Sequence, residues 1–199
     1  MFDDAQLNTE TEDAAKAAKR TSLEERLFKA RTILIYGAIN QKVAETVSAR
    51  LLALSADADE PITVYINSQG GHVESGDTIH DMIKFVKPVV RVVGTGWVAS
   101  AGALIYSAAR KENRLSLPNT RFMLHQPSGG AGGTASDIAI MAKEIVRMRG
   151  RLNEIFARET GQPLERIQRD TERDYWMSAQ EAKEYGLVGR IVANAAELD

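Results

Sequence analysis

The chain contains no cysteine among its 199 residues. Disulfide bonds, thiolate catalysis and cysteine-ligated metal sites are therefore excluded, and the composition fits the reducing cytoplasm, where we expect the protein to work. The net charge is only −2, so the charge balance indicates neither a nucleic acid nor an anionic membrane as a partner. No apolar run has the length of a membrane span, and the first twenty residues lack the apolar block of a secretory signal.

What the chain does contain is an ordinary globular composition, with 44% hydrophobic and 26% charged residues. This length suffices for one domain with a sizeable core. Residues 1–20 are polar and rich in charge, which predicts a mobile N-terminal arm. Residues 21–199 are expected to form the single domain, and a Ser-x-x-Glu capping box at Ser22–Glu25 predicts its first short helix.

Short apolar runs alternate with segments of helical periodicity along this domain. The runs predict strands at 32–36, 62–66, 89–94, 121–124 and 189–193. The periodic segments predict helices at 41–55 and 74–86, after residue 100, at 135–159 with Gly161 as its C-terminal cap, and at 179–185. The glycine-rich stretch SQGGHVESG (68–76) is expected to be a loop that enters the helix at 74–86. Alternating strands and helices predict an α/β fold with parallel strands.

Two of the polar residues stand where α/β proteins build their sites. Ser100 follows a predicted strand and begins a helix, and His125 ends another strand before a glycine-rich loop. A serine becomes nucleophilic when a base, usually an imidazole, takes its proton, and a carboxylate then orients that imidazole. Position alone does not select the carboxylate among 27 acidic residues, and a Ser–Lys dyad stays open on the same grounds. His80 is expected to be a partly exposed helix residue.

The paired glycines Gly70 and Gly71 follow the second strand. Such a pair lets backbone N–H groups approach a ligand closely, so one of them, with the N–H that follows Ser100, could form an oxyanion hole. The alternative is a tight turn from strand to helix. His72 lies beside them, but no second ligand occurs at a recognisable spacing, and we expect no metal site.

Several stretches together resemble the proteolytic subunit of the Clp protease, the ClpP family of serine peptidases. The resemblance covers roughly residues 30–193. It is carried by YINSQGG (65–71), GWVASAGA (96–103), LPNTRFMLHQPSGG (117–130), GRLNEIFARETGQ (150–162) and TERDYWMSAQEAKEYGLV (171–188). Several motifs at compatible spacing are far more specific than one serine or one pair of glycines.

The resemblance implies a ClpP/crotonase-like fold and a serine endopeptidase that cleaves unfolded proteins and short peptides. The family's nucleophile, base and acid fall on Ser100, His125 and Asp174, and its oxyanion donors fall on the backbone N–H groups of Gly71 and Ala101. No cofactor enters this chemistry. ATP would be consumed by a partner, since the sequence contains no P-loop pattern.

The family also implies an assembly of two stacked seven-membered rings and an AAA+ unfoldase partner of the ClpX or ClpA type. The segment at about 125–160 would be the handle that joins the rings, and Arg173 falls on the family's ring-contact arginine. Small residues beside Ser100 would leave room for a substrate chain to lie as an added strand.

Departures from the family pattern concern the substrate cleft and the N-terminus. Gln69 stands where proline is usual, Trp97 stands near a usual glutamine, and His72 replaces a small or aliphatic residue, so substrate preference is expected to differ. The family's N-terminal pore-loop pattern is not recognisable in residues 11–31. Of the aromatic residues typical of its partner-docking pocket, Tyr65 and Phe85 are kept, whereas Thr63 and Leu115 replace others.

Three alternatives follow from these departures and from the fold. The chain could assemble with a paralogous subunit in mixed rings, or it could be a modulatory subunit of such a complex. A crotonase-type acyl-CoA enzyme would share the fold and the backbone oxyanion hole, but it would not need the serine, histidine and aspartate together. Hydrolysis of a peptide-like ester, without activity on acyl-CoA, separates that enzyme from a peptidase.

Overall fold

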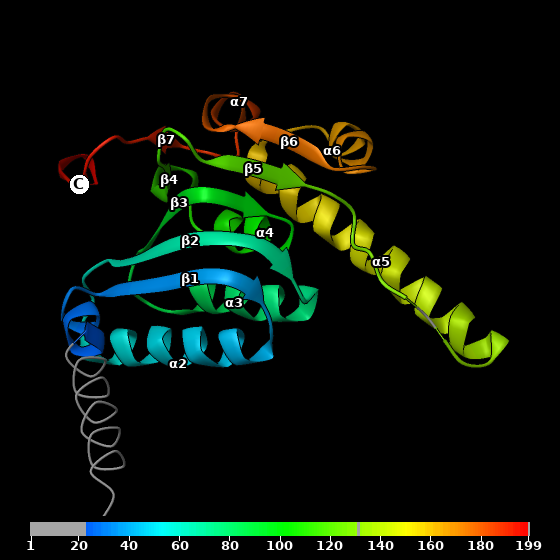
Figure 1. The fold of residues 1–199 in the computed structure, drawn as a ribbon, viewed down its shortest axis with the longest axis horizontal. Coiled ribbons are helices and arrows are strands. Elements are labelled where there is room, and N and C mark those ends of the chain that lie inside the picture. Colours follow the sequence, from blue (N-terminus) through cyan, green and yellow to red (C-terminus); the bar gives the residue numbers. More distant parts are fainter. Residues whose placement is uncertain (1–22, 131, 199) are drawn as a thin grey trace, which may run out of the picture.

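The structure, a computed structural model, describes residues 23–130 and 132–198. The arm expected at 1–20 and the capping residue Ser22 lie outside the described residues. Residues 23–29 are helical and lead into the first strand. The α/β fold predicted from the alternation of strands and helices is confirmed (Figure 1).

The described residues form one seven-stranded sheet in the order β1-β2-β3-β4-β7, in which β5 also pairs with β3 and β6 pairs with β5. All of these pairs are parallel except β5–β6, which is antiparallel. The strands are β1 (Thr32–Ile39), β2 (Ile62–Gly71), β3 (Val90–Ala99), β4 (Arg114–Ser116), β5 (Arg121–Leu124), β6 (Tyr175–Ser178) and β7 (Arg190–Ile191).

The core lies between this sheet and the helices. Figure 1 shows α2 and α3 side by side along one face of β1–β3. Alternate residues of β2, among them Ile62, Val64 and Ile66, are fully buried on that face, as the period of a strand requires. The longer helices are α2 (Gln41–Asp57), α3 (Val73–Phe85) and α5 (Ala135–Thr160), and the short ones are α4 (Ala101–Ser107), α6 (Leu164–Asp170) and α7 (Ala179–Tyr185).

The long helix predicted at 135–159 is present as α5, and it projects well beyond the edge of the sheet (Figure 1). Thr134 and Asp137 form a capping box at its N-terminus, and Gly161 ends it in the left-handed conformation with φ of 77°. Its buried residues begin only at Leu152. The second half of α5 is therefore part of the domain, whereas the first half extends away from it.

The sequence prediction was wrong about several boundaries. The segment 68–71, expected to be a loop, continues β2, and β3 extends to Ala99 instead of ending near residue 94. The strands β4 and β6 and the helix α6 were not expected at all, and the antiparallel β6 departs from a purely parallel sheet. Small and polar residues have low strand propensity, but ladder partners on neighbouring strands, such as Ile39 for Gly71, keep them extended.

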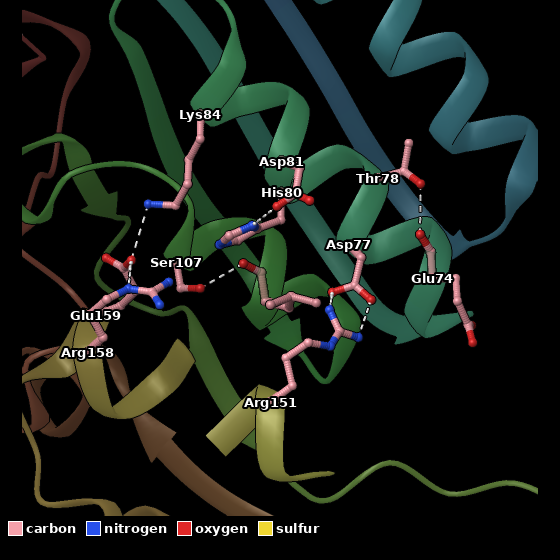
Figure 2. Close-up of polar contacts among 11 residues, drawn as sticks. Glu74, Asp77, Thr78, His80, Asp81, Lys84, Ser107, Arg151, Arg158 and Glu159 are labelled. Carbon is pink, nitrogen blue, oxygen red and sulfur yellow. Dashed lines mark hydrogen bonds and ion pairs between the residues drawn. The ribbon is translucent and has the colours of Figure 1, made fainter. Parts of the chain in front are cut away.

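His80 was also expected to be partly exposed, and the structure contradicts this. Its side chain is buried between α3 and neighbouring elements, with Nδ1 2.9 Å from an Asp81 carboxylate oxygen (Figure 2). The reason is that α4 packs closely on α3, since a Cβ atom at Gly76 would lie only 3.1 Å from the Cβ atom of Ala101. Helical periodicity does not reveal that a second face is covered.

Candidate active site

Ser100 occupies the sharp junction between β3 and α4. Its φ of 55° and ψ of −122° make it one of two non-glycine residues with positive φ in the described chain, the other being Arg31. Such a conformation is costly for an L-residue and is often found where a side chain must be presented for function. The backbone N–H of Ser100 donates to the Met123 carbonyl at 2.9 Å, which ties this junction to β5.

Strand pairing explains how three distant residues meet. The last β3–β5 pair is Ala99 with Met123, so Ser100 comes next to the C-terminal end of β5. The antiparallel β5–β6 ladder pairs Leu124 with Tyr175. One step further along this ladder, His125 lies opposite Asp174.

The side chains of these residues form a continuous chain of polar contacts. Ser100 Oγ is 2.8 Å from His125 Nε2, and His125 Nδ1 is 3.0 Å from Asp174 Oδ1. The His125 side chain is 25% exposed and that of Asp174 is 61% exposed. The hydroxyl can therefore pass its proton to an imidazole that a carboxylate orients, without rearrangement of the three groups.

Of the paired glycines, Gly70 lies directly against Ser100, whereas Gly71 lies against β1. A Cβ atom at Gly70 would be 2.6 Å from Ser100 Cβ and 3.0 Å from the backbone N of Ala101, and Gly70 has φ of 96°. A Cβ atom at Gly71 would be 2.2 Å from the Ile39 carbonyl oxygen. Only glycine allows the end of β2 to approach both β1 and the serine so closely.

An apolar pocket opens beside the serine and the histidine, on the helix-covered side of the sheet. Sequence reasoning missed its lining, because these residues come from four separate segments and have ordinary core character. Apart from Ser100 and His125, the lining consists of Val73, Ala101, Leu104, Pro127, Leu152 and Phe156.

Ion pairs hold the base of α5, and hence two of these lining residues, against α3 (Figure 2). Both carboxylate oxygens of Asp77 accept from the Arg151 guanidinium, at 2.7 and 2.6 Å. This hydrogen bonding raises the pKa of Arg151 above its ordinary value. About two helical turns further along both helices, Lys84 donates to Glu159 at 3.2 Å. Leu152 follows Arg151 directly, so the pair fixes the pocket wall.

The structure does not gather the expected cleft residues around the pocket. Gln69 is exposed at the end of β2, and His72 caps α3, with Nε2 3.2 Å from a Glu74 carboxylate oxygen. His72 lines a groove between α2 and α3 instead. Trp97 stacks on Trp176, and Arg173 is exposed beside Asp174.

In residues 23–130 and 132–198, no three histidine or acidic side chains gather where they could hold a metal ion. Over the same part of the chain, no helix has both the length and the apolar character needed to cross a membrane.

A serine, an imidazole and a carboxylate in hydrogen-bonded series, placed at the ends of strands in this α/β fold, form the arrangement that serine hydrolases use. The chain belongs to the Clp protease family, whose profile matches residues 15–195, and it is a proteolytic subunit.

Similar proteins support this membership over most of the chain. An ATP-dependent Clp protease proteolytic subunit 3 of Rhizobium etli is 65% identical over 175 residues, which cover 88% of this chain and 90% of that protein. A proteolytic subunit 2 of Gluconobacter oxydans is 62% identical over 180 residues, covering 89% and 81%. The solved structure of ClpP1 from Listeria monocytogenes has a TM-score of 0.82 and 58% identity, covering 89% of this chain and 99% of that one.

Proposed function

We propose that Ser100, His125 and Asp174 are the catalytic triad with which this endopeptidase cleaves peptide bonds. The observation that carries the proposal is the pair of contacts at 2.8 and 3.0 Å that joins the three side chains in order. The positive φ of Ser100 is a second support, because backbone strain of this kind is concentrated at functional sites, and here it falls on the residue that presents the hydroxyl.

In this mechanism His125 Nε2 accepts the hydroxyl proton as Ser100 Oγ attacks the peptide carbonyl carbon. The imidazolium then donates that proton to the leaving amine, and Asp174 holds the ring in the required tautomer throughout. Water, deprotonated by His125 in turn, hydrolyses the acyl-enzyme and regenerates the serine. Every proton is moved by these side chains.

The backbone N–H groups of Gly71 and Ala101 would stabilise the oxyanion of each tetrahedral intermediate. Support comes from the close approach of Gly70, the neighbour of Gly71, to Ser100 and to the Ala101 nitrogen. A substrate chain in the extended conformation would lie along the end of β2. Gln69 and His72 flank that end of β2 and are proposed to bias which peptides are cut.

The decisive experiment compares the unmodified chain with Ser100→Ala. The unmodified chain should hydrolyse a fluorogenic peptide and react with a fluorophosphonate probe at one serine. Ser100→Ala should do neither, while its mass in solution and its melting temperature stay the same. Retained turnover in Ser100→Ala would assign the nucleophile elsewhere, and inactivity of the unmodified chain alone would favour a modulatory subunit.

The same proposal extends to assembly and partners. The chain would form two stacked heptameric rings that receive unfolded polypeptides from a Clp ATPase of the ClpX or ClpA type. Support comes from the names of the relatives, which are subunits of ATP-dependent proteases and are numbered 2 and 3. Numbered subunits imply paralogues, so mixed rings belong to the proposal, with Arg173 at the contact between rings.

The cellular location proposed for this assembly is the cytoplasm. The cysteine-free composition is compatible with that reducing compartment.

A further inference from the structure

The only two tryptophans of the chain stack on one another. The ring centroids of Trp97 and Trp176 are 6.3 Å apart and the ring planes differ by 14°. The Arg121 guanidinium carbon lies 4.3 Å from the centroid of the Trp176 ring. All three side chains are exposed at the surface, with Trp97 at 42% and Trp176 at 36%. We call Trp97, Arg121 and Trp176 the tryptophan clamp.

The clamp links the three strands that lead to the proposed triad. Trp97 is on β3, three residues before Ser100, whereas Trp176 is on β6, two residues after Asp174. Arg121, on the intervening β5 that leads to His125, is the ladder partner of Trp97. The ladder partner of Trp176 is Met123, so the two indoles meet diagonally across β5. The stack therefore joins two strands that are not hydrogen-bonded to each other.

The clamp lies on the opposite side of the sheet from the pocket. The ladder partners Val98 and Phe122 follow Trp97 and Arg121 along their strands and are fully buried in the helix-covered core. Because successive strand residues point to opposite faces, the clamp occupies the face opposite to this core. The pocket beside Ser100 is lined from α3, α4 and α5 on the other side. The clamp is thus placed to act on the strands and not on a substrate in that pocket.

The acid of the triad lies next to a short edge strand. The segment before it is fixed by Gln126, whose backbone N–H donates to the Thr171 carbonyl at 2.6 Å and whose side-chain amide donates to the Glu172 carbonyl at 2.8 Å. β6 has four residues and pairs with β5 alone in the sheet. A four-residue strand at the edge of a sheet has few ladder hydrogen bonds to fix its position. The Asp174 side chain is 61% exposed, and the one hydrogen bond that it makes in the described chain is to His125. Stacked aromatic rings and a cation over a ring add directional contacts across these strands.

We propose that Trp97, Arg121 and Trp176 are positioning residues that hold β6, and with it Asp174, in register with Ser100 and His125. This inference rests on the proposed triad. It assigns Trp97 a role in the rate of the chemical step, where the sequence alone indicated a role in the choice of substrate. Displacements of about 1 Å in a catalytic group lower turnover by up to about a hundredfold, so loss of the clamp should act on kcat.

The test uses the full-length assembled protein with Trp97→Gln, Trp176→Gln, the double variant and the conservative Trp97→Phe. Rates are expressed per active site, titrated with a fluorophosphonate probe, for a panel of fluorogenic peptides, so that unfolded protein does not count. Tyr36→Gln is the matched control, because Tyr36 is an exposed aromatic residue on β1, away from β5 and β6. Mass in solution and melting temperature are measured for each variant.

Trp97→Gln should lower kcat about tenfold for every peptide, with KM within about twofold, and Trp97→Phe should restore most of the rate. The double variant should be no slower than the slower single variant, because the rings act as a pair. Tyr36→Gln should behave like the unmodified protein. Three results would each overturn the proposal. They are an unchanged kcat per site in Trp97→Gln, a kcat loss in the double variant equal to the product of the two single losses, and a changed order of the peptides caused by KM. Inactivity of the unmodified protein would instead count against the triad itself.

Discussion

Asp174 lies directly opposite His125, one residue outside the β5–β6 ladder, with its Oδ1 atom 3.0 Å from His125 Nδ1. The two residues are 49 positions apart in the chain. The long helix α5 and the helix α6 are inserted between them, so a short antiparallel pair of strands brings the chain back to the histidine. The position of the acid therefore depends on how β6 is held.

Removal of one member of the proposed triad should cost about as much as removal of two. His125→Ala and Asp174→Asn should each lower kcat by several orders of magnitude, since the base and its orienting carboxylate act through the serine. The double variant Ser100→Ala/His125→Ala should be no less active than Ser100→Ala. The measurement is steady-state hydrolysis of a fluorogenic peptide. Multiplicative losses in the double variant would show that the two residues act independently.

Gly70→Ala should nearly abolish turnover. Its Cβ atom would lie 2.6 Å from Ser100 Cβ, at a φ of 96° that disfavours alanine, so the serine must shift. We expect a fall in kcat of about a hundredfold, together with slower fluorophosphonate labelling.

Gly150→Ala is the control for that substitution. A Cβ atom at Gly150 meets nothing within 4 Å, and the residue lies inside α5. Alanine there should raise the free energy of unfolding by about 0.5–1 kcal/mol, measured by denaturation, and should leave kcat unchanged. Equal activity of Gly70→Ala and Gly150→Ala would contradict the close approach of β2 to the nucleophile.

Loss of the Asp77–Arg151 ion pair should loosen α5 at its base. Arg151→Met removes two hydrogen bonds at 2.7 and 2.6 Å, and it should lower the free energy of unfolding by about 1 kcal/mol. Because Leu152 lines the pocket, KM for apolar peptides should rise as well. Arg147→Met is the control, since its pair with Glu144 is well exposed on both sides. A control that is as destabilised as Arg151→Met would show that the bidentate pair adds nothing.

The departures at the N-terminus predict weak cooperation with an ATPase. The chain alone should cut short peptides, but it should degrade a tagged folded protein slowly when mixed with a ClpX- or ClpA-type ATPase and ATP. The reason is that a hexameric partner binds through many repeated contacts, and small losses in each multiply around the ring. The measurement is the degradation rate relative to the peptidase rate. Rapid degradation with tight binding by this chain alone would exclude the prediction.

Much of the fold follows from local pattern in the sequence. The amphipathic periodicity of α5 and its glycine cap at Gly161 appear in the structure as predicted. The helix predicted at 179–185 likewise appears as α7, and a capping box at Ser178 begins it. These features depend on residues within one or two helical turns, so neighbours in sequence are enough to predict them.

The sequence by itself determined the chemistry that is present: one serine at a strand end, one histidine at another, and a motif around Asp174 that resembles a known family. Only the tertiary structure decided which of these groups meet, that Gly70 and Gly71 extend a strand against Ser100, and that Trp97 stacks on Trp176. The physical reason is that β6 has only four residues, too few for a periodic pattern that would predict a strand or a helix. Its place is decided by pairing with β5, a contact between segments about fifty residues apart.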